Sequence, residues 1–206
     1  FKLSTLPSNG SFYSNSAGTG TALTTTDVIA ATSNGATIYF KPNADWNGST
    51  NFQYSATDNN GLISGSNATG TITVNPVNDA PVAQATTASG NEDTIIAVSL
   101  SGTDVDGTVA SFKLSTLPSN GSFYSNSAGT GTALTTTDVI TATSNGATIY
   151  FKPNADWNGS TSFQYSATDN NGLISGSNAT GTITVTAVND VPTATANSVT
   201  TDEDTP

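Results

Sequence analysis

The sequence lacks four residue types that carry much of protein chemistry, because its 206 residues include no cysteine, histidine, methionine or arginine. Without cysteine there is no disulfide framework, thiolate nucleophile or zinc–thiolate site. Without histidine, the commonest general base and the commonest metal ligand are both missing. Four lysines against 15 acidic residues give a net charge of −11, which argues against a nucleic-acid partner. The remaining chemistry is that of carboxylates, and hard oxygen ligands point first to calcium.

Long apolar runs are absent as well. No stretch of 18 apolar residues predicts a membrane-spanning helix, so we expect no membrane insertion. No basic region followed by an apolar one marks a signal peptide. Phe1 lies inside a strand-like pattern, so we expect the chain to be a piece of a longer protein.

A long internal repeat organises the chain. Residues 1–74 match residues 112–185 without gaps, at an offset of 111 and with only two differences. A period of this size corresponds to one small domain rather than to a solenoid unit. The sequence therefore predicts a tandem array of whole modules, whose near-identity favours a spacer or a multivalent display over a specialised catalytic site.

The module boundaries follow from the repeated Asn-Asp-x-Pro linker, because proline stiffens an extended connection between domains. We predict the back part of one module at 1–79, a complete module at 80–189 and the start of a third at 190–206. Residues 1–79 contain no counterpart of 80–111. We therefore expect unpaired sheet edges and a partly exposed core in that first part.

The apolar residues alternate with a period of two and are bounded by turn residues, which is typical of β-strands. Asn-Gly turns are predicted at Asn120, Asn145 and Asn158. The fold class is therefore all-β, an antiparallel β-sandwich in tandem immunoglobulin-like or cadherin-like modules with a 111-residue period. The strands are predicted at 82–87, 94–100, 109–117, 122–124, 133–136, 147–152, 162–168 and 180–186.

The acidic residues lie in turn or linker motifs, with Asp27 and its repeat Asp138 as the exceptions. If strand ends meet at one pole of the sandwich, the carboxylates of Asp79, Asp104, Asp106 and Asp169 converge there. Such a cluster needs a counter-cation to stay ionised. Calcium, which takes six to eight oxygen ligands, suits these acids and the asparagines beside them better than magnesium does.

Several motifs in order resemble the cadherin-like tandem repeats of large bacterial RTX-type surface adhesins. They are the stretch 163–169, Thr182-Ile183-Thr184-Val185, Val188-Asn189-Asp190-x-Pro192, Asn91-Glu92-Asp93-Thr94, Asp104-Val105-Asp106-Gly107 and 151–159. The resemblance covers a whole module. It implies an immunoglobulin-like sandwich, calcium ions at module junctions and an extender role in a long secreted adhesin.

The resemblance also implies the metal ligands. One junction would use Asp45, Asn78, Asp79, Asp104, Asp106 and Asp169, and the other would use Glu92, Asp156, Asn189 and Asp190. The Asn154-Ala155-Asp156 triplet replaces an acidic-basic-acidic one, which favours one or two ions per junction.

We therefore expect a calcium-stiffened extender of an extracellular bacterial surface adhesin, which projects a distal binding domain for adhesion or biofilm formation. Its partners would be calcium ions and neighbouring modules of the same chain. The alternative is a multivalent module that recognises a glycan or protein ligand through loops at one pole, with Trp157 as a candidate contact. No enzymatic activity is expected, because a module of this size rarely offers the cleft that paired carboxylates need.

Overall fold

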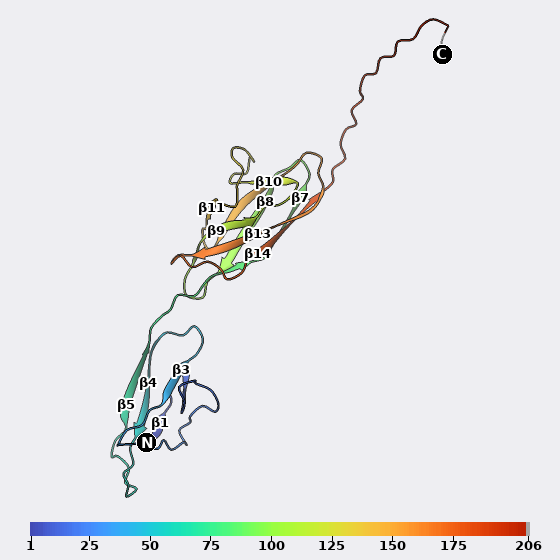
Figure 1. Cartoon of the computed structure of the whole chain (residues 1–206). Coiled ribbons are helices and arrows are strands. Elements are labelled where there is room, and N and C mark those ends of the chain that lie inside the picture. Colours follow the sequence, from blue (N-terminus) through green and yellow to red (C-terminus); the bar gives the residue numbers. More distant parts are fainter. Residues whose placement is uncertain (205–206) are drawn as a thin grey trace. The chain divides into compact units, whose positions relative to one another are not determined.

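The computed structural model describes residues 1–204 and divides the chain into two compact units, Phe1–Asn78 and Asp79–Pro206. Residues 205 and 206, which end the predicted third module, lie outside the described residues. All regular elements of the described part are β-strands (Figure 1), and no helix there is long and apolar enough to cross a membrane. The predicted third module stays a prediction, because residues 187–204 form no strand.

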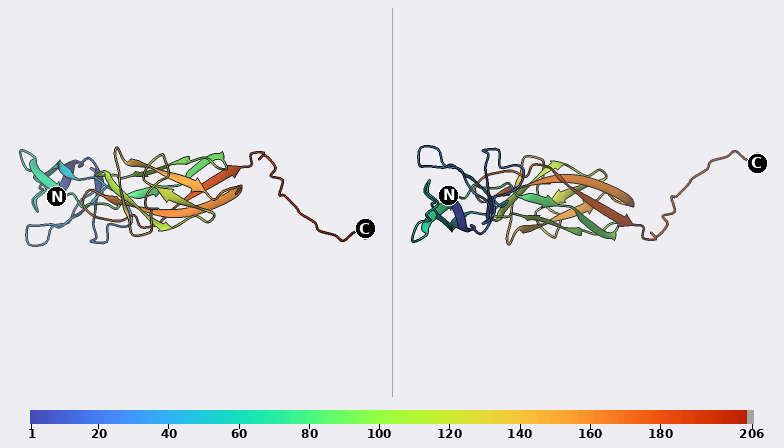
Figure 2. Two further views of the ribbon diagram at one scale, coloured as in Figure 1. Left: turned by 90° about the horizontal axis from the view of Figure 1, so that it is seen from above. Right: turned by 90° about the horizontal axis from the view of Figure 1, so that it is seen from below.

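The second unit is a two-layer sandwich. Its strands are β6 (Val82–Gln84), β7 (Thr86–Asn91), β8 (Ile96–Thr103), β9 (Val109–Thr116), β10 (Gly121–Tyr124), β11 (Val139–Thr141), β12 (Gly146–Pro153), β13 (Gly159–Asp169) and β14 (Ala179–Thr186). One sheet has the order β10-β12-β8-β6 and the other β11-β9-β13-β14-β7. Figure 2 shows the strands of this unit, coloured green to red, in two further views. β7 runs parallel to β14, and the other listed pairs of this unit are antiparallel. The prediction of an all-β sandwich is confirmed.

The core of the second unit follows from the period-two pattern of its strands. In β8, Ile96, Val98 and Leu100 are buried, and the residues between them are exposed. β13 alternates in the same way from Thr161 onward. Because successive side chains leave a strand on opposite faces, each strand contributes one apolar face to a shared core.

Aromatic rings fill the middle of this core. Phe123 meets Phe163 edge to face, with ring centroids 4.8 Å apart, and Phe112 meets Tyr165 at 5.7 Å. The hydroxyl of Tyr165 donates a hydrogen bond to the carbonyl oxygen of Gln84, where the chain passes from β6 to β7 and so from one sheet to the other. Burial raises the pKa of the Tyr165 phenol. Tyr165 thus fastens the strand that changes sheets.

Two strand predictions were wrong in detail. Residues 133–136 form no strand, because the backbone amide and hydroxyl of Thr135 both donate to Oδ2 of Asp138 at 2.7 Å and close a turn. These bonds lower the pKa of Asp138. The strand follows them as β11. The predicted strand at 82–87 is in fact two strands, and β7 extends to Asn91 along a polar sequence.

The predicted Asn-Gly turns formed at two of three positions. Asn120 and Asn145 adopt left-handed backbone conformations, with φ of 59° and 62°. In the 154–159 loop the left-handed residue is Asp156, with φ of 57°, and the amide of Trp157 donates to the carbonyl of Asn154 at 3.2 Å. This loop therefore turns two residues earlier than predicted, which aims the Asp156 side chain outward.

The first unit repeats part of this sandwich. Its strands are β1 (Lys2–Thr5), β2 (Gly10–Tyr13), β3 (Tyr39–Pro42), β4 (Gly48–Ser55) and β5 (Ala68–Val74). They form two sheets, β1-β4-β5 and β2-β3. Residues 1–78 contain no counterpart of β6, β7 or β8. As expected, its apolar side chains are less well covered than those of the second unit.

We expect Tyr165→Phe to lower the free energy of unfolding of the second unit by about 0.5 to 1.5 kcal/mol, because the hydrogen bond from the Tyr165 hydroxyl to the carbonyl of Gln84 is lost. Urea denaturation followed by tryptophan fluorescence measures this loss. Tyr54→Phe is the matched control, since the first unit has no counterpart of Gln84. Equal effects of the two substitutions would contradict the assigned role of Tyr165.

Candidate metal centres

Eight acidic residues of the second unit lie near the two ends of β8. Asp93, Asp156 and Asp190, with Glu92 beside them, form the Asp190 cluster near the start of β8. Asp79, Asp104, Asp106 and Asp169 form the Asp104 cluster beyond its end. Loops or strand ends carry all of these residues, so their positions depend on turns rather than on strand faces.

The Asp190 cluster is a group of three exposed carboxylates. Oxygen atoms of Asp93, Asp156 and Asp190 all lie within 4.8 Å of one another. They come from the β7–β8 turn, the β12–β13 loop and the segment after β14. The backbone amide of Asp156 donates to Oδ1 of Asp93 at 3.2 Å, so the two loops are tied together. Asp93 and Asp156 both have left-handed φ values, of 59° and 57°.

The carboxyl of Asp190 is affected by both desolvation and the neighbouring acids. Partial desolvation, followed by the negative charges of Asp156, Asp93 and Glu92, raises the pKa of its carboxyl. A cation placed among these oxygens would remove that repulsion. The cluster therefore has both the geometry and the electrostatic state that favour binding of a cation.

Glu92, one of the implied ligands, is engaged in hydrogen bonds inside the unit. Its side chain is buried, at 4% exposure, and its Oε1 accepts a hydrogen bond from the backbone amide of Val188 at 2.6 Å. Oε2 accepts a hydrogen bond from the side-chain amide of Asn158 at 3.4 Å. The backbone amide of Glu92 also donates to the carbonyl of Thr186 at 2.9 Å. Glu92 thus holds the segment that leaves β14 and so positions Asp190.

Asp93, which the implied ligand set omits, joins the cluster in place of Glu92. The motif Asn91-Glu92-Asp93 contained both acids, but the sequence did not show which of the two would face outward. The structure separates them because Glu92 continues the end of β7 and Asp93 occupies the left-handed turn. Asn189 is exposed, and its side-chain amide donates to the carbonyl of Asp190 at 3.3 Å.

The Asp104 cluster is tied by backbone amides. The amide of Asp106 donates to Oδ1 of Asp104 at 3.3 Å, and the amide of Asp79 lies 3.3 Å from both oxygens of Asp106. Asp169 is buried, at 2% exposure, and its Oδ1 accepts from the amides of Asn171 and Leu173. Among the described residues, only the Asp190 cluster brings oxygens of three acids within 4.8 Å, so these four do not converge that closely.

One carboxylate oxygen of the Asp104 cluster is nevertheless buried without a hydrogen bond. Oδ2 of Asp104 is buried and has no hydrogen-bond partner among the described residues. A Cβ atom added at Gly107 would lie 3.0 Å from this oxygen and 2.7 Å from Oδ1 of Asn170. The two oxygens thus converge over Gly107, where only glycine leaves room. Asn170, which sequence reasoning did not select, also accepts a hydrogen bond from the amide of Thr108 at 2.8 Å.

The first unit contains the same acid-bearing loops without all of the strands that surround them in the second unit. Asp58, the counterpart of Asp169, accepts from the amides of Asn60 and Leu62 at 2.9 and 2.8 Å but is exposed. The turn is therefore local, and burial of Asp169 comes from the surrounding strands. Asp45, the counterpart of Asp156, is exposed with φ of 57°, and no group of three acids includes it in the described chain. Asn78 is the last residue of this unit.

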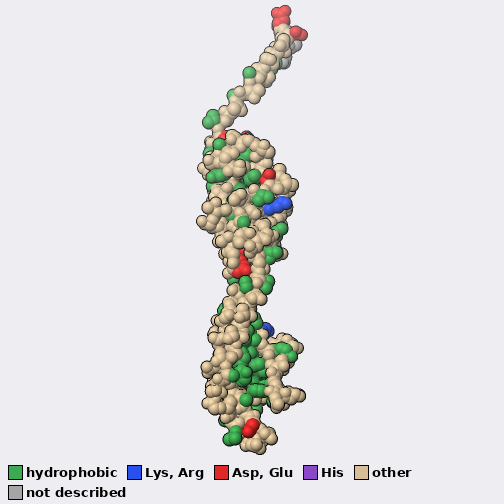
Figure 3. Space-filling model, turned by 90° about the vertical axis from the view of Figure 1, so that its left-hand side faces the viewer, with side chains coloured by type: hydrophobic (Ala, Val, Ile, Leu, Met, Phe, Trp, Pro, Cys, Tyr) green, Lys and Arg blue, Asp and Glu red, His purple; other side chains and the backbone are tan. Residues whose placement is uncertain are grey.

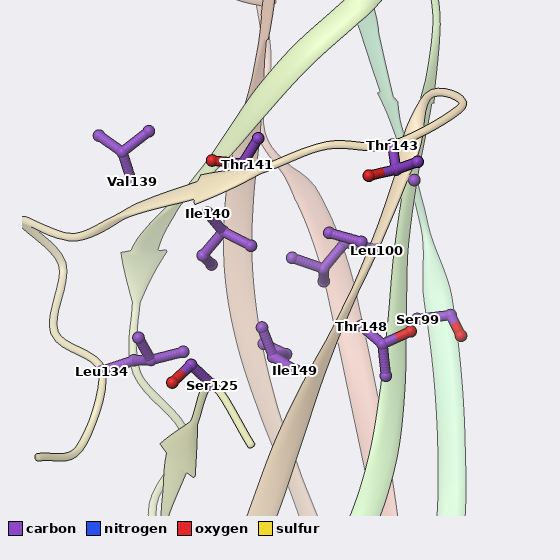
Figure 4. Close-up of a pocket in the computed structure, with 12 residues that line it drawn as sticks. Ser99, Leu100, Ser125, Leu134, Val139, Ile140, Thr141, Thr143, Thr148 and Ile149 are labelled. Carbon is purple, nitrogen blue, oxygen red and sulfur yellow. The ribbon is translucent and has the colours of Figure 1, made fainter. Parts of the chain in front are cut away.

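The second unit also has a pocket away from both clusters, with a volume of about 600 Å³. Leu100, Leu134, Ile140 and Ile149 contribute aliphatic side chains, and serine and threonine hydroxyls lie among them (Figure 4). No charged side chain lines it. Trp157, the candidate for ligand stacking, is partly buried and packs against the core.

Comparison with known proteins agrees with this architecture. The chain belongs to the bacterial Ig domain family, whose model matches residues 78–186, more than half of the chain. A solved structure of domains 4 and 5 of the S-layer protein SbsC is similar at 14% identity and a TM-score of 0.34. The similarity covers 86% of this chain and 70% of that one, and at this level it has no bearing on function. A search of curated proteins found no match.

We expect Asp190→Asn to raise the melting temperature of the calcium-free protein at pH 7. A raised carboxyl pKa means that this group contributes stability below its ordinary value of 3.8 and loses it as the pH rises through the raised value. The advantage of the variant should therefore shrink near pH 3. Asp202→Asn, which removes a charge outside the cluster, is the control. An unchanged melting temperature at pH 7 would contradict repulsion at Asp190.

Proposed function

We propose that this chain is a calcium-stiffened extender of a long, secreted bacterial surface adhesin. Membership in the bacterial Ig domain family fits a structural, non-catalytic protein at the cell surface. The observation that carries the finer proposal is the Asp190 cluster, in which three carboxylates from three separate loops have oxygens within 4.8 Å of one another. A distal domain carried by such an array would make the adhesive or biofilm-forming contact.

The donor set favours calcium among the common cations. Calcium accepts six to eight oxygen ligands in flexible geometry, from carboxylates, amide or backbone carbonyls and water. The chain offers no thiolate or imidazole, so softer metals lack their preferred ligands. Asp93, Asp156 and Asp190 would hold the ion. Their exposure leaves room for water to complete its coordination.

A second cation would fit at the other end of the unit. The buried, unpartnered Oδ2 of Asp104 is an acceptor that lacks a donor, and a buried charge in that state is costly. Oδ1 of Asn170 converges with it over Gly107. Asp106 and Asp169 lie in the same loops. A hard cation is a better partner for Oδ2 of Asp104 than a hydrogen-bond donor. The backbone amides nearby already donate to the other carboxylate oxygens of this cluster.

Stiffening would follow from where the ligands lie in the chain. Asp190 belongs to the segment that leaves the sandwich, and Asp79 belongs to the segment that enters it. Ions at both ends would tie the entering and leaving segments to loops of the sandwich. Without the ions, the carboxylates repel and both segments gain freedom. An extender needs this control of direction at each unit.

We expect calcium at 100 times its dissociation constant to add about 2.7 kcal/mol to the free energy of unfolding of the second unit. For a unit of this size the melting temperature rises by roughly 10 °C or more. Calorimetry with calcium and with a chelator measures the change. Asp156→Asn should remove the part of the rise that the Asp190 cluster contributes, whereas Asp45→Asn, at the same position of the first unit, should leave the whole rise. Equal melting temperatures with calcium and chelator would refute the proposal.

We also expect the length of a longer array to depend on calcium. Small-angle scattering of several tandem copies of residues 80–190 should show a larger maximum dimension with calcium than with chelator. Asp104→Ala combined with Asp106→Ala should shorten the calcium-bound array, because one end of each unit loses its ligands. A maximum dimension that ignores both calcium and the substitutions would rule out stiffening, even if calcium binds.

A further inference from the structure

Strands β7 and β14 connect the two ends of the second unit. The chain enters this unit just before β6 and β7, and it leaves the unit directly after β14. The two strands pair in parallel, from Gly181↔Thr86 to Thr186↔Asn91. The entering segment therefore meets the pair at its Thr86 end, and the departing segment leaves it at its Thr186 end.

This arrangement determines how the pair responds to tension along the chain. Residues 1–78 precede the unit and residues 187–206 follow it, so a pull on the chain draws β7 and β14 lengthwise in opposite directions. Because the ladder hydrogen bonds run across the strands, such a pull loads all of them together. A pair that is pulled open from one end breaks its bonds one after another instead. The lengthwise arrangement is therefore the more resistant one.

A buried side chain fastens each end of the pair. At the entry end, the hydroxyl of Tyr165 on β13 donates to the carbonyl of Gln84, just before β7 begins. At the exit end, the carboxylate of Glu92 accepts a hydrogen bond from the amide of Val188 at 2.6 Å. The backbone amide of Glu92 also donates to the carbonyl of Thr186 at 2.9 Å, which extends the ladder past the end of β7. Tension on either segment acts on these contacts as well as on the ladder.

The two strands of the pair are held to the sandwich in different ways. β14 is anchored in the core by Ile183 and Val185, at 0% and 3% exposure, whereas β7 buries none of its side chains fully. Neither strand contains a charged residue, and charged side chains are sparse on the face of the chain that Figure 3 shows. Attachment of β7 therefore depends mainly on its backbone ladder with β14. Sliding of β7 along β14 is the first large step that tension can cause.

We infer that the β7–β14 pair is the mechanical clamp of the second unit, meaning the contact that must separate before tension can extend residues 92–178. Glu92 is the lock at the exit end of this clamp, because it ties the departing segment to the end of β7. The clamp itself requires no bound calcium. Only its use rests on the proposed extender role, since a surface spacer is pulled along its chain by whatever its distal end holds.

Optical tweezers test the clamp on the full chain. The sequence has no cysteine, so substitutions at exposed valines attach the handles at defined positions and leave the first unit outside the load. Val77→Cys with Val191→Cys pulls β7 and β14 lengthwise. Val77→Cys with Val105→Cys pulls the antiparallel β6–β8 pair open from one end, because Val82 pairs with Thr103. At equal force, we expect unfolding to be at least about tenfold slower in the first geometry, since several backbone hydrogen bonds break together.

Glu92→Gln tests the lock. Glutamine keeps the size and an acceptor oxygen but loses the charge that strengthens the bond to the amide of Val188. We expect unfolding to become about fivefold faster in the lengthwise geometry and to stay unchanged in the Val77–Val105 geometry. Glu203→Gln is the matched control, because Glu203 has the same place in the repeated Glu-Asp-Thr motif but lies beyond the sandwich. It should change neither rate.

Each geometry is measured with chelator and with saturating calcium, and the lengthwise geometry should be the slower one in both conditions. Equal unfolding rates in the two geometries would overturn the clamp. An equal effect of Glu92→Gln in both geometries would overturn the lock, since Glu92 would then stabilise the whole unit rather than the exit end of β7. A melting temperature that ignores calcium would refute the calcium proposal but would leave the order of these rates intact.

Discussion

The burial of the apolar face of β8 is the interaction on which the sandwich depends. With Ile96, Val98 and Leu100 in place, the facing aromatic rings are covered, β12 forms a full strand and the two sheets close on one core. The first unit, with nearly the same sequence but without this strand, keeps its sheets and turns and loses the closure. Local sequence therefore determines the hairpins, and one strand completes the core.

Charge is separated from this core along the chain. Serine and threonine occupy many of the outward strand positions, and acids occupy the turns at either end. Glu92 connects the core to the exposed acids. Its buried carboxylate accepts a hydrogen bond from the amide of Val188 and so orients the segment after β14 that bears Asp190. The candidate metal centre thus depends on a buried hydrogen bond a few residues away. The same backbone that ends β7 places Asp93 outward and Glu92 inward.

The sequence was sufficient to predict the sandwich, because alternation of apolar and polar residues is a local signal that β8, β12, β13 and β14 all carry. It could not predict β7, whose polar sequence pairs with β14 only through tertiary contacts. Asp156 and Asp190 were among the predicted ligands, and the structure brings their carboxylates together. Asp93 was left out of the implied ligand set and Asn170 was not selected, because choosing between adjacent polar residues requires the φ angle and packing of each turn.

The order of elements along the chain has a consequence for synthesis. β8 precedes the strands β9 to β14, which complete the core around it. During translation β8 therefore leaves the ribosome before these strands, and they assemble around a strand that is already present. The matching strand of a following repeat would emerge only after this core is closed. In an array of near-identical units, this order protects each unit from exchanging strands with its neighbour, a characteristic misfolding route of repeat proteins.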